Sequence, residues 1–209
     1  IVAEGERERV YLPPVGEHEL VAEQAEPSWR PGGEVPPRLT GGTCVPYGLN
    51  EWGDLFTARQ LVALNTFSDM IPVVRERVQN DAVSTSIDDE GTSSEANGKG
   101  ASAYADAVAV YLACALSRQA NRLATICIWN RTGEKIEQVF RRQAIPMTWD
   151  FAEANVFSGS TGGWTGSSEW VPAVIQGLPA SRPGHCSQLD AAQQLMSFRK
   201  LVSTDPPYY

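Results

Sequence analysis

A helix-start signal at Phe56–Leu61, followed by a long apolar stripe, constrains the fold more than any other part of the chain. Thr57 and Gln60 have the spacing of a capping box, in which each side chain accepts a hydrogen bond from the backbone N–H of the other residue. The apolar residues that follow recur at helical intervals, at Leu61, Leu64, Phe67, Ile71, Val74 and Val78. We therefore predict a helix that begins just after Thr57, and we expect Pro72 to kink or split it.

A second helix is expected from about Ser102 to Arg122, where apolar residues cover more than one face and predict a well-buried element. Between the two helices, residues 80–100 are polar, acidic and rich in glycine and serine, which favours an exposed and mobile loop. Residues 125–129 fit either a strand or the end of the second helix, and a short helix is expected over residues 134–142.

Residues 158–166 are dense in glycine and contain Trp164. They lack the Lys-[Ser/Thr] ending of a phosphate-binding loop, so we interpret them as a flexible, tryptophan-bearing loop. Ser167 or Ser168 would then cap a short helix. Trp149 and Trp170 are expected in the core rather than on a surface where bases could stack.

The last part of the chain has the pattern of a strand, a short helix and a second strand. The first strand would end at Asp190, and the second would cover Leu201–Thr204. This order, with function at the carboxyl ends of the strands, is typical of an open α/β sheet. We therefore expect a mixed α/β chain in three parts, which are an irregular acidic Pro/Gly-rich arm at 1–46, a largely helical region at 47–180 and the strand–helix–strand segment at 181–209.

The charge of the chain limits how it could meet nucleic acid. A net charge of −8 and an isoelectric point of about 4.8 argue against a protein that coats nucleic acid through charge alone. Acidic residues crowd the N-terminus, whereas the C-terminal third is more basic, so a local basic groove is compatible with the sequence.

The cysteines and the apolar segments exclude several classes of protein. The four cysteines are far apart and form no Cys-x-x-Cys pair, so neither zinc nor another metal is expected. Cys114 and Cys127 lie in apolar surroundings and are expected to be buried thiols. The N-terminus is not typical of a signal peptide, and the longest apolar stretch, 107–116, is about half the length of a membrane span. We therefore expect a cytoplasmic protein that does not contact a membrane.

The chain ends in a short motif, Asp205-Pro206-Pro207-Tyr208, that indicates methylation of an amino nitrogen. The Asp205 carboxylate and the Pro206 carbonyl can each accept one N–H from an exocyclic amine, which aims the nitrogen lone pair at a methyl donor. The two prolines stiffen the loop, and Tyr208 offers a flat face for a planar substrate. Asp-Pro-Pro also occurs where a proline-rich loop ends without any catalytic role.

Several stretches together resemble one family of large prokaryotic proteins described as adenine-specific DNA methylases. The resemblance covers roughly residues 45–209. Its matching stretches are Tyr47-Gly48, Trp52–Phe56, Arg59–Leu61, Pro146–Asn155, the Gly162-Gly163-Trp164 loop and Thr204–Tyr209. The final motif is similar to that of adenine-N6 and cytosine-N4 DNA methyltransferases.

The resemblance implies an S-adenosylmethionine-dependent methyltransferase of Rossmann-like fold with a largely helical insertion, acting on the N6 amino group of adenine in DNA. Asp205–Tyr208 fall on the catalytic motif, and Asp205 would also lie at the cofactor. Asp190 falls near the acid that contacts the adenine of the cofactor in such enzymes. The target base would be flipped out of the DNA duplex, and Tyr208 would cover it.

The family also implies a place for DNA contacts between the cofactor motif and the catalytic motif. The candidates in this interval are Arg59, Arg131, Arg141, Arg142 and Trp164. The chain has no Phe-x-Gly-x-Gly loop of the kind that holds the cofactor's methionine part in this family. We therefore expect an internal fragment that needs the remainder of its parent polypeptide and is inactive alone.

Two alternatives remain open. Similar loops serve methylation of RNA bases and of glutamine side chains, so the substrate could be RNA or protein. The chain could also be a helical DNA-binding or interaction module without catalysis of its own. A serine or cysteine hydrolase is poorly supported, because His18 and His185 lie in no recognisable nucleophile motif.

Overall fold

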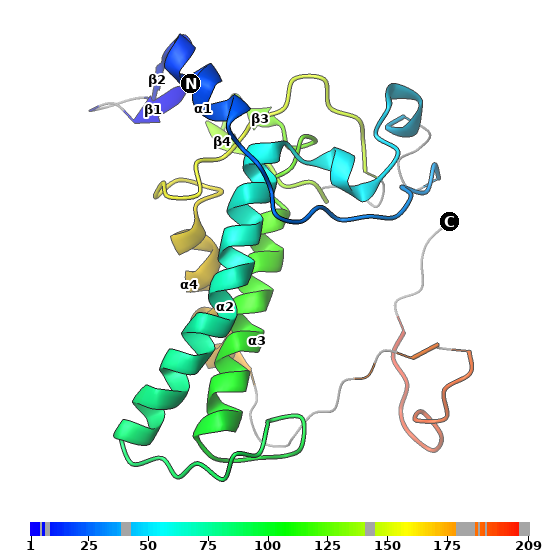
Figure 1. Cartoon of the computed structure of the whole chain (residues 1–209). Coiled ribbons are helices and arrows are strands. Elements are labelled where there is room, and N and C mark those ends of the chain that lie inside the picture. The colour runs from blue at the N-terminus through cyan, green and yellow to red at the C-terminus, as the bar shows by residue number, and fades with distance from the viewer. Residues whose placement is uncertain are drawn as a thin grey trace. The chain divides into compact units, whose positions relative to one another are not determined.

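The computed structural model describes residues 1–4, 6, 9–38, 43–140, 145–178, 187, 189–190 and 192–204. The chain divides into two compact units, Ile1–Gln176 and Gly177–Tyr209. The first unit mixes helices with two small antiparallel sheets (Figure 1). Its elements, in chain order, are β1 (Val2–Glu4), β2 (Arg9–Tyr11), α1 (Gly16–Glu23), two 3-10 turns (Val45–Tyr47 and Trp52–Leu55), α2 (Ala58–Ser84), α3 (Ala101–Ala120), β3 (Trp129–Asn130), β4 (Lys135–Ile136) and α4 (Trp164–Gly177).

Helix α2 begins where the capping signal predicts. The Gln60 N–H donates to Thr57 Oγ1 at 3.2 Å, and the Thr57 N–H donates to Gln60 Oε1 at 2.8 Å, which confirms the capping box. Pro72 lies inside α2, and the helix continues through it to Ser84, so the proline does not split the helix. The missing N–H of one proline is tolerated here because α3 packs along α2 and stabilises it (Figure 1).

Replacing Thr57 with alanine is expected to lower the free energy of unfolding by about 1 kcal/mol, because the Gln60 N–H at the helix start loses its acceptor. Thr66→Ala is the matched control, since the Thr66 hydroxyl lies mid-helix and donates only to the Val62 carbonyl at 2.7 Å. Urea denaturation of both variants measures the difference. Equal losses would show that the cap contributes nothing of its own.

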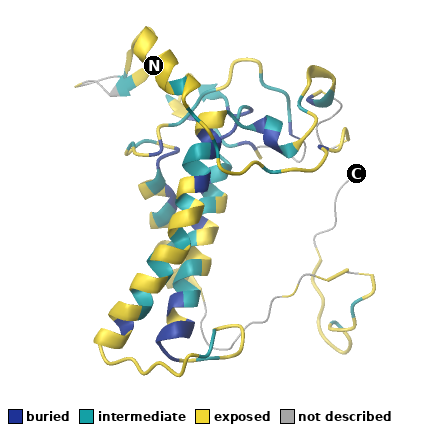
Figure 2. Cartoon of the chain, viewed as in Figure 1, coloured by how far each residue is buried: buried dark blue, intermediate teal, exposed yellow. Residues whose placement is uncertain are grey.

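Helix α3 runs beside α2, and six of its 20 residues are buried (Figure 2). Its buried residues are Ala101, Ser102, Ala103, Ala105, Ala115 and Gln119. On its other faces Tyr104 is 53% exposed and Val110 is 59% exposed. The prediction of a well-buried helix is therefore wrong, because small residues form the helix contact and the larger apolar side chains point elsewhere. Cys114 is also exposed rather than buried, whereas Cys127 is fully buried.

The segment between α2 and α3 is exposed, as predicted, but it is tied to both helices. The Asp89 carboxylate accepts hydrogen bonds from Ser102 Oγ at 2.7 Å and from Gln79 Nε2 at 2.8 Å. The Asp106 carboxylate accepts one from the Ser94 N–H at 2.9 Å. The expected loop at 80–100 is corrected in its bounds, since α2 extends to Ser84, and these bonds tie the rest of it to both helices.

The tie through Asp89 makes stability depend on pH. Hydrogen bonds from Ser102, Gln79 and Gly91 lower the pKa of Asp89 to about 2. A carboxylate with a lowered pKa stabilises the fold above its ordinary pKa of about 4, and this contribution is lost as the pH falls toward 2. We expect Asp89→Asn to flatten the fall of the denaturation midpoint between pH 4 and pH 2. Asp88→Asn, in the same loop, should keep the wild-type profile; the same flattening in both variants would contradict the assignment.

The main core lies beyond one end of the α2–α3 pair. It gathers Val35, Leu55, Ala124, Ile126, Cys127, Ile136, Val139 and Ile145. Of the strand expected at 125–129, only Trp129 belongs to one, in β3, and residues 125 and 126 form a turn. The helix expected at 134–142 is wrong, since the described part of this range contains strand β4. The reason is the hairpin turn, where the Asn130 side chain accepts the N–H groups of Thr132 at 3.0 Å and Gly133 at 2.8 Å.

Helix α4 begins at Trp164, before the serines that were expected to cap it. In the second unit, the described residues of 191–196 form turns rather than a helix. Residues Leu201–Thr204 are not in a strand, and Leu201 is fully exposed. Both predictions for this unit are wrong at these positions, where the apolar side chains of Leu195, Leu201 and Val202 are mostly exposed and do not select one face.

Candidate functional site

The residues predicted to carry out catalysis lie outside the described part of the chain. This holds for Asp205, Pro206, Pro207 and Tyr208, and also for Arg141 and Arg142. Asp190 is described and exposed. Its carboxylate accepts the Ala192 N–H at 2.9 Å, so it caps a turn in the second unit.

The structure gives two of the predicted DNA-contacting residues a partner within the protein. Arg59 pairs with Glu153 through Nε and one terminal nitrogen, each 2.9 Å from a carboxylate oxygen, and this pairing raises the pKa of Arg59. The Trp164 ring stacks on Phe67 of α2, with centroids 4.3 Å apart and planes 14° apart. Arg131 is exposed at the tip of the β3–β4 hairpin. Two of these three side chains are therefore engaged within the protein, and Arg131 is the exposed one at the hairpin tip.

Two tryptophans expected in the core are exposed. Trp149 meets Tyr47 edge to face, with ring centroids 4.5 Å apart. The Arg118 guanidinium lies over Trp170 at 4.8 Å from the ring centroid. Both rings thus pack against one neighbour and leave the rest of their surface to solvent.

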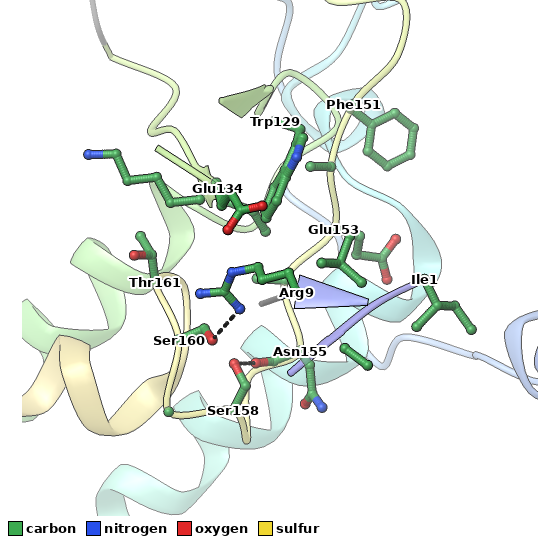
Figure 3. Close-up of a pocket in the computed structure, with 17 residues that line it drawn as sticks. Ile1, Arg9, Trp129, Glu134, Phe151, Glu153, Asn155, Ser158, Ser160 and Thr161 are labelled. Carbon is green, nitrogen blue, oxygen red and sulfur yellow. Dashed lines mark hydrogen bonds between the residues drawn. The ribbon is translucent and has the colours of Figure 1, made fainter. Parts of the chain in front are cut away.

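An open pocket of about 780 Å³, called the cavity below, lies within the first unit and forms the candidate site (Figure 3). Its walls come from β1 and β2, from the β3–β4 hairpin and from the segment 151–161. Its polar and aromatic lining consists of Arg9, Trp129, Glu134, Lys135, Phe151, Glu153, Asn155, Ser158, Ser160 and Thr161. The volume is within the range of pockets that take nucleotides and other small molecules.

The glycine-dense wall of this cavity is a hydrogen-bonded turn that leads into α4, so residues 164–166 are helical and not part of the expected loop. The Trp164 N–H donates to the Val156 carbonyl at 2.7 Å, and the Gly163 N–H donates to the Ser160 carbonyl at 2.9 Å. Gly162 has a φ of 100°, which favours glycine, and a Cβ there would meet the Ala154 side chain. Close packing thus requires glycine at 162 and at 163, where a Cβ would meet the Ser158 carbonyl.

The buried side chain of Gln119 forms a hydrogen bond to this glycine-dense turn. Gln119 of α3 is fully buried, and its Nε2 donates to the Gly162 carbonyl. Its Oε1 accepts from the Ser167 hydroxyl at 2.7 Å, and Ser167 is itself buried in α4. One side chain therefore joins the glycine turn to two helices and fixes the wall that carries Ser158 and Ser160.

Arg9 is the cation that contacts the glycine-dense wall of the cavity. Arg9 donates to Ser160 Oγ at 3.3 Å (Figure 3). The charge of Glu153 is balanced by Arg59, and Lys135 lies 3.9 Å from the Glu137 carboxylate. Glu134 is a non-glycine residue with a φ of 44°, an uncommon conformation that is found more often at functional sites.

Sequence reasoning missed Arg9, Trp129, Glu134 and Ser160 as members of one site. The turn at 130–133 was a usable signal for the hairpin that presents Trp129 and Glu134. No local signal links Arg9 to Ser160, which are 151 residues apart.

Among the described helices, none combines the length and hydrophobicity that a membrane crossing requires. The residues with described positions form no cluster of three or more His, Cys, Asp or Glu side chains that could hold a metal ion. Comparison of the chain with protein-family models, with curated proteins and with solved structures finds no match in any of the three.

Proposed function

We propose that this chain supplies the amino-methyltransferase loop of an S-adenosylmethionine-dependent enzyme of Rossmann-like fold that methylates N6 of adenine in DNA, in the cytoplasm. The observation that carries the proposal is the sequence Thr204-Asp205-Pro206-Pro207-Tyr208. Asp205 accepts one N–H of the adenine amine, the Pro206 carbonyl accepts the other, and Tyr208 stacks on the flipped base. The cofactor supplies the methyl group.

The surface of the second unit supports the view that this loop belongs to a larger assembly. Leu195 is 86% exposed, Phe198 is 75% exposed and Leu201 is 102% exposed. Such a concentration of exposed apolar side chains usually marks a surface that another part of a protein covers. The proposal assigns that covering to the remainder of the parent methyltransferase.

Calorimetric titration with S-adenosylmethionine tests the proposal. It should be applied to this chain and to a longer polypeptide that extends the sequence at both ends. We expect only the longer polypeptide to bind the cofactor and to transfer a labelled methyl group to an adenine-containing DNA duplex. RNA and protein substrates in parallel assays distinguish the alternative acceptors. Failure of both polypeptides to bind the cofactor would overturn the proposal.

A second candidate, a non-catalytic interaction module, is favoured by one observation. Helix α3 leaves Tyr104 and Val110 more than half exposed, and Tyr111 lines a shallow apolar pocket against α4. A helical pair with an exposed aromatic and aliphatic face suits contact with another protein. Absence of S-adenosylmethionine binding by the longer polypeptide would favour this interaction module over the methyltransferase.

A further inference from the structure

We propose that the cavity between β1–β2, the β3–β4 hairpin and residues 151–161 binds a nucleoside monophosphate. Its phosphate would lie at Arg9 and Ser160, and its base would lie against Trp129. The proposal is independent of methyl transfer, because every residue that carries it belongs to the first unit and none belongs to the Asp205 motif.

The anion end of the cavity is formed by Arg9 and the serine-bearing turn. The Arg9 guanidinium already donates to Ser160 Oγ at 3.3 Å and keeps further N–H groups for a phosphate oxygen. Arg9 is half-buried, which strengthens its attraction for an anion compared with a fully solvated arginine. The turn that carries Ser160 is fixed by Gln119 and by its own backbone hydrogen bonds, so little ordering is required when a ligand binds.

The aromatic end is formed by Trp129, which lies beside Glu134 (Figure 3). Trp129 packs partly against the core, and its Nε1 donates to the Tyr11 hydroxyl at 3.3 Å, so the ring is oriented before a ligand arrives. A planar base stacks on such a ring with a gain of about 1–3 kcal/mol, as measured for bases on aromatic side chains.

Glu134 is the residue proposed to bind the ribose hydroxyls and to select a monophosphate over a triphosphate. Its left-handed backbone lies at the end of the hairpin turn, and its carboxylate is part of the cavity lining. A carboxylate accepts hydrogen bonds from ribose hydroxyls, which is how acidic residues contact the sugar in dinucleotide sites. The same negative charge opposes the extra charges of a triphosphate. Glu153 is paired with Arg59, and Lys135 lies beside Glu137. Arg9 and Glu134 are thus the charged lining side chains without an ion-pair partner among the described residues, and this balance favours a single phosphate.

Calorimetric titration of the full chain with three ligands tests the proposal. The ligands are AMP, adenosine and inorganic phosphate. We expect AMP to bind at least about tenfold more tightly than adenosine, because the charge-assisted bonds to Arg9 require the phosphate. Inorganic phosphate alone should bind more weakly than AMP. Equal affinity for AMP and adenosine, or no binding of AMP at millimolar concentration, would overturn the proposal.

Variants separate the two ends of the cavity. Arg9→Gln should reduce the affinity for AMP to that for adenosine and leave the affinity for adenosine unchanged. Trp129→Leu should lower the affinities for AMP and for adenosine by a similar factor. Trp129→Phe should keep most of the wild-type affinity. Arg77→Gln is the matched control, since it removes one exposed cation of α2 that is not part of the cavity lining. If Arg77→Gln lowers the affinity for AMP as much as Arg9→Gln does, general electrostatic attraction explains the binding and the proposed site is wrong.

A competition experiment identifies the source of the nucleotide. A short single-stranded oligo(dA) that displaces AMP shows that the cavity takes a nucleotide within a strand, whereas retention of AMP shows that it takes the free nucleotide. Circular dichroism and thermal unfolding of Arg9→Gln confirm the fold, and Ser160→Ala provides an independent test of the phosphate end. An unchanged preference for AMP over adenosine in both folded variants would contradict the assignment.

Discussion

Asp205→Ala in the longer polypeptide should reduce methyl transfer to adenine by about a thousandfold while leaving S-adenosylmethionine binding within a few-fold of wild type. The expectation follows from the proposed role of the carboxylate, which accepts an amine N–H and stabilises the positive charge that develops on nitrogen. Removing one positioned group of this kind typically costs about 10²–10³ in turnover. Single-turnover transfer of a labelled methyl group measures the chemical step directly.

The control for this experiment is Asp69→Ala, which removes an exposed aspartate from α2 and should leave the rate unchanged. Asp205→Asn keeps an oxygen acceptor without the charge, and its rate should lie between those of the wild type and the alanine variant. A wild-type rate for Asp205→Ala would show that the motif is a proline-rich loop without a catalytic role.

Gln119→Leu should destabilise the first unit by about 2–4 kcal/mol. The substitution leaves the Gly162 carbonyl and the Ser167 hydroxyl without their partner in a buried site, and each such group costs about 1–3 kcal/mol. The free energy of unfolding from urea denaturation, monitored by tryptophan fluorescence, measures the loss. The many tryptophans of the chain, including Trp164 next to the turn, make fluorescence a sensitive probe.

A double-mutant cycle isolates the hydrogen bond from the change in packing. Ser167→Ala removes the donor, so Gln119→Leu in that background should cost less than in the wild type by about 1 kcal/mol or more. Gln79→Leu is the matched control for the loss of an amide, because Gln79 forms its bonds in a part-buried place between α2 and α3. Strictly additive losses at Gln119 and Ser167 would show that the bond does not couple the turn to α4.

The parts of the fold that could be predicted from sequence are those fixed by neighbours in the chain. Thr57 and Gln60 are three residues apart, so their reciprocal bonds need only the local helix, and α2 begins at the predicted place. Helix α3 is close to its expected bounds because an uninterrupted run of helix-forming residues precedes Asn121. The burial of α3 could not be predicted, because it depends on how many faces find a partner.

The candidate site could not be predicted because contacts between distant residues create it. The glycine turn looks flexible in the sequence, but Gln119, far from it in the chain, makes it a fixed wall. Arg59 looks like a surface cation available to DNA, but Glu153 pairs with it. The positions of Asp205–Tyr208 and of Arg141 and Arg142 lie outside the described residues, so their predicted roles stay predictions.

The cavity walls come from segments that are far apart in the sequence, and we expect these walls to form after the α2–α3 pair during folding. The helical pair is built from segments that adjoin in sequence, so its contact order is low and its formation is fast. The wall contact between Arg9 and Ser160 closes a loop of 151 residues, which is entropically costly until the core near Ile126 has assembled. We therefore expect hydrogen exchange to show the α2–α3 amides protected first during refolding and β1–β2 last. The native protein would then open its cavity by releasing β1–β2 while the helices stay folded.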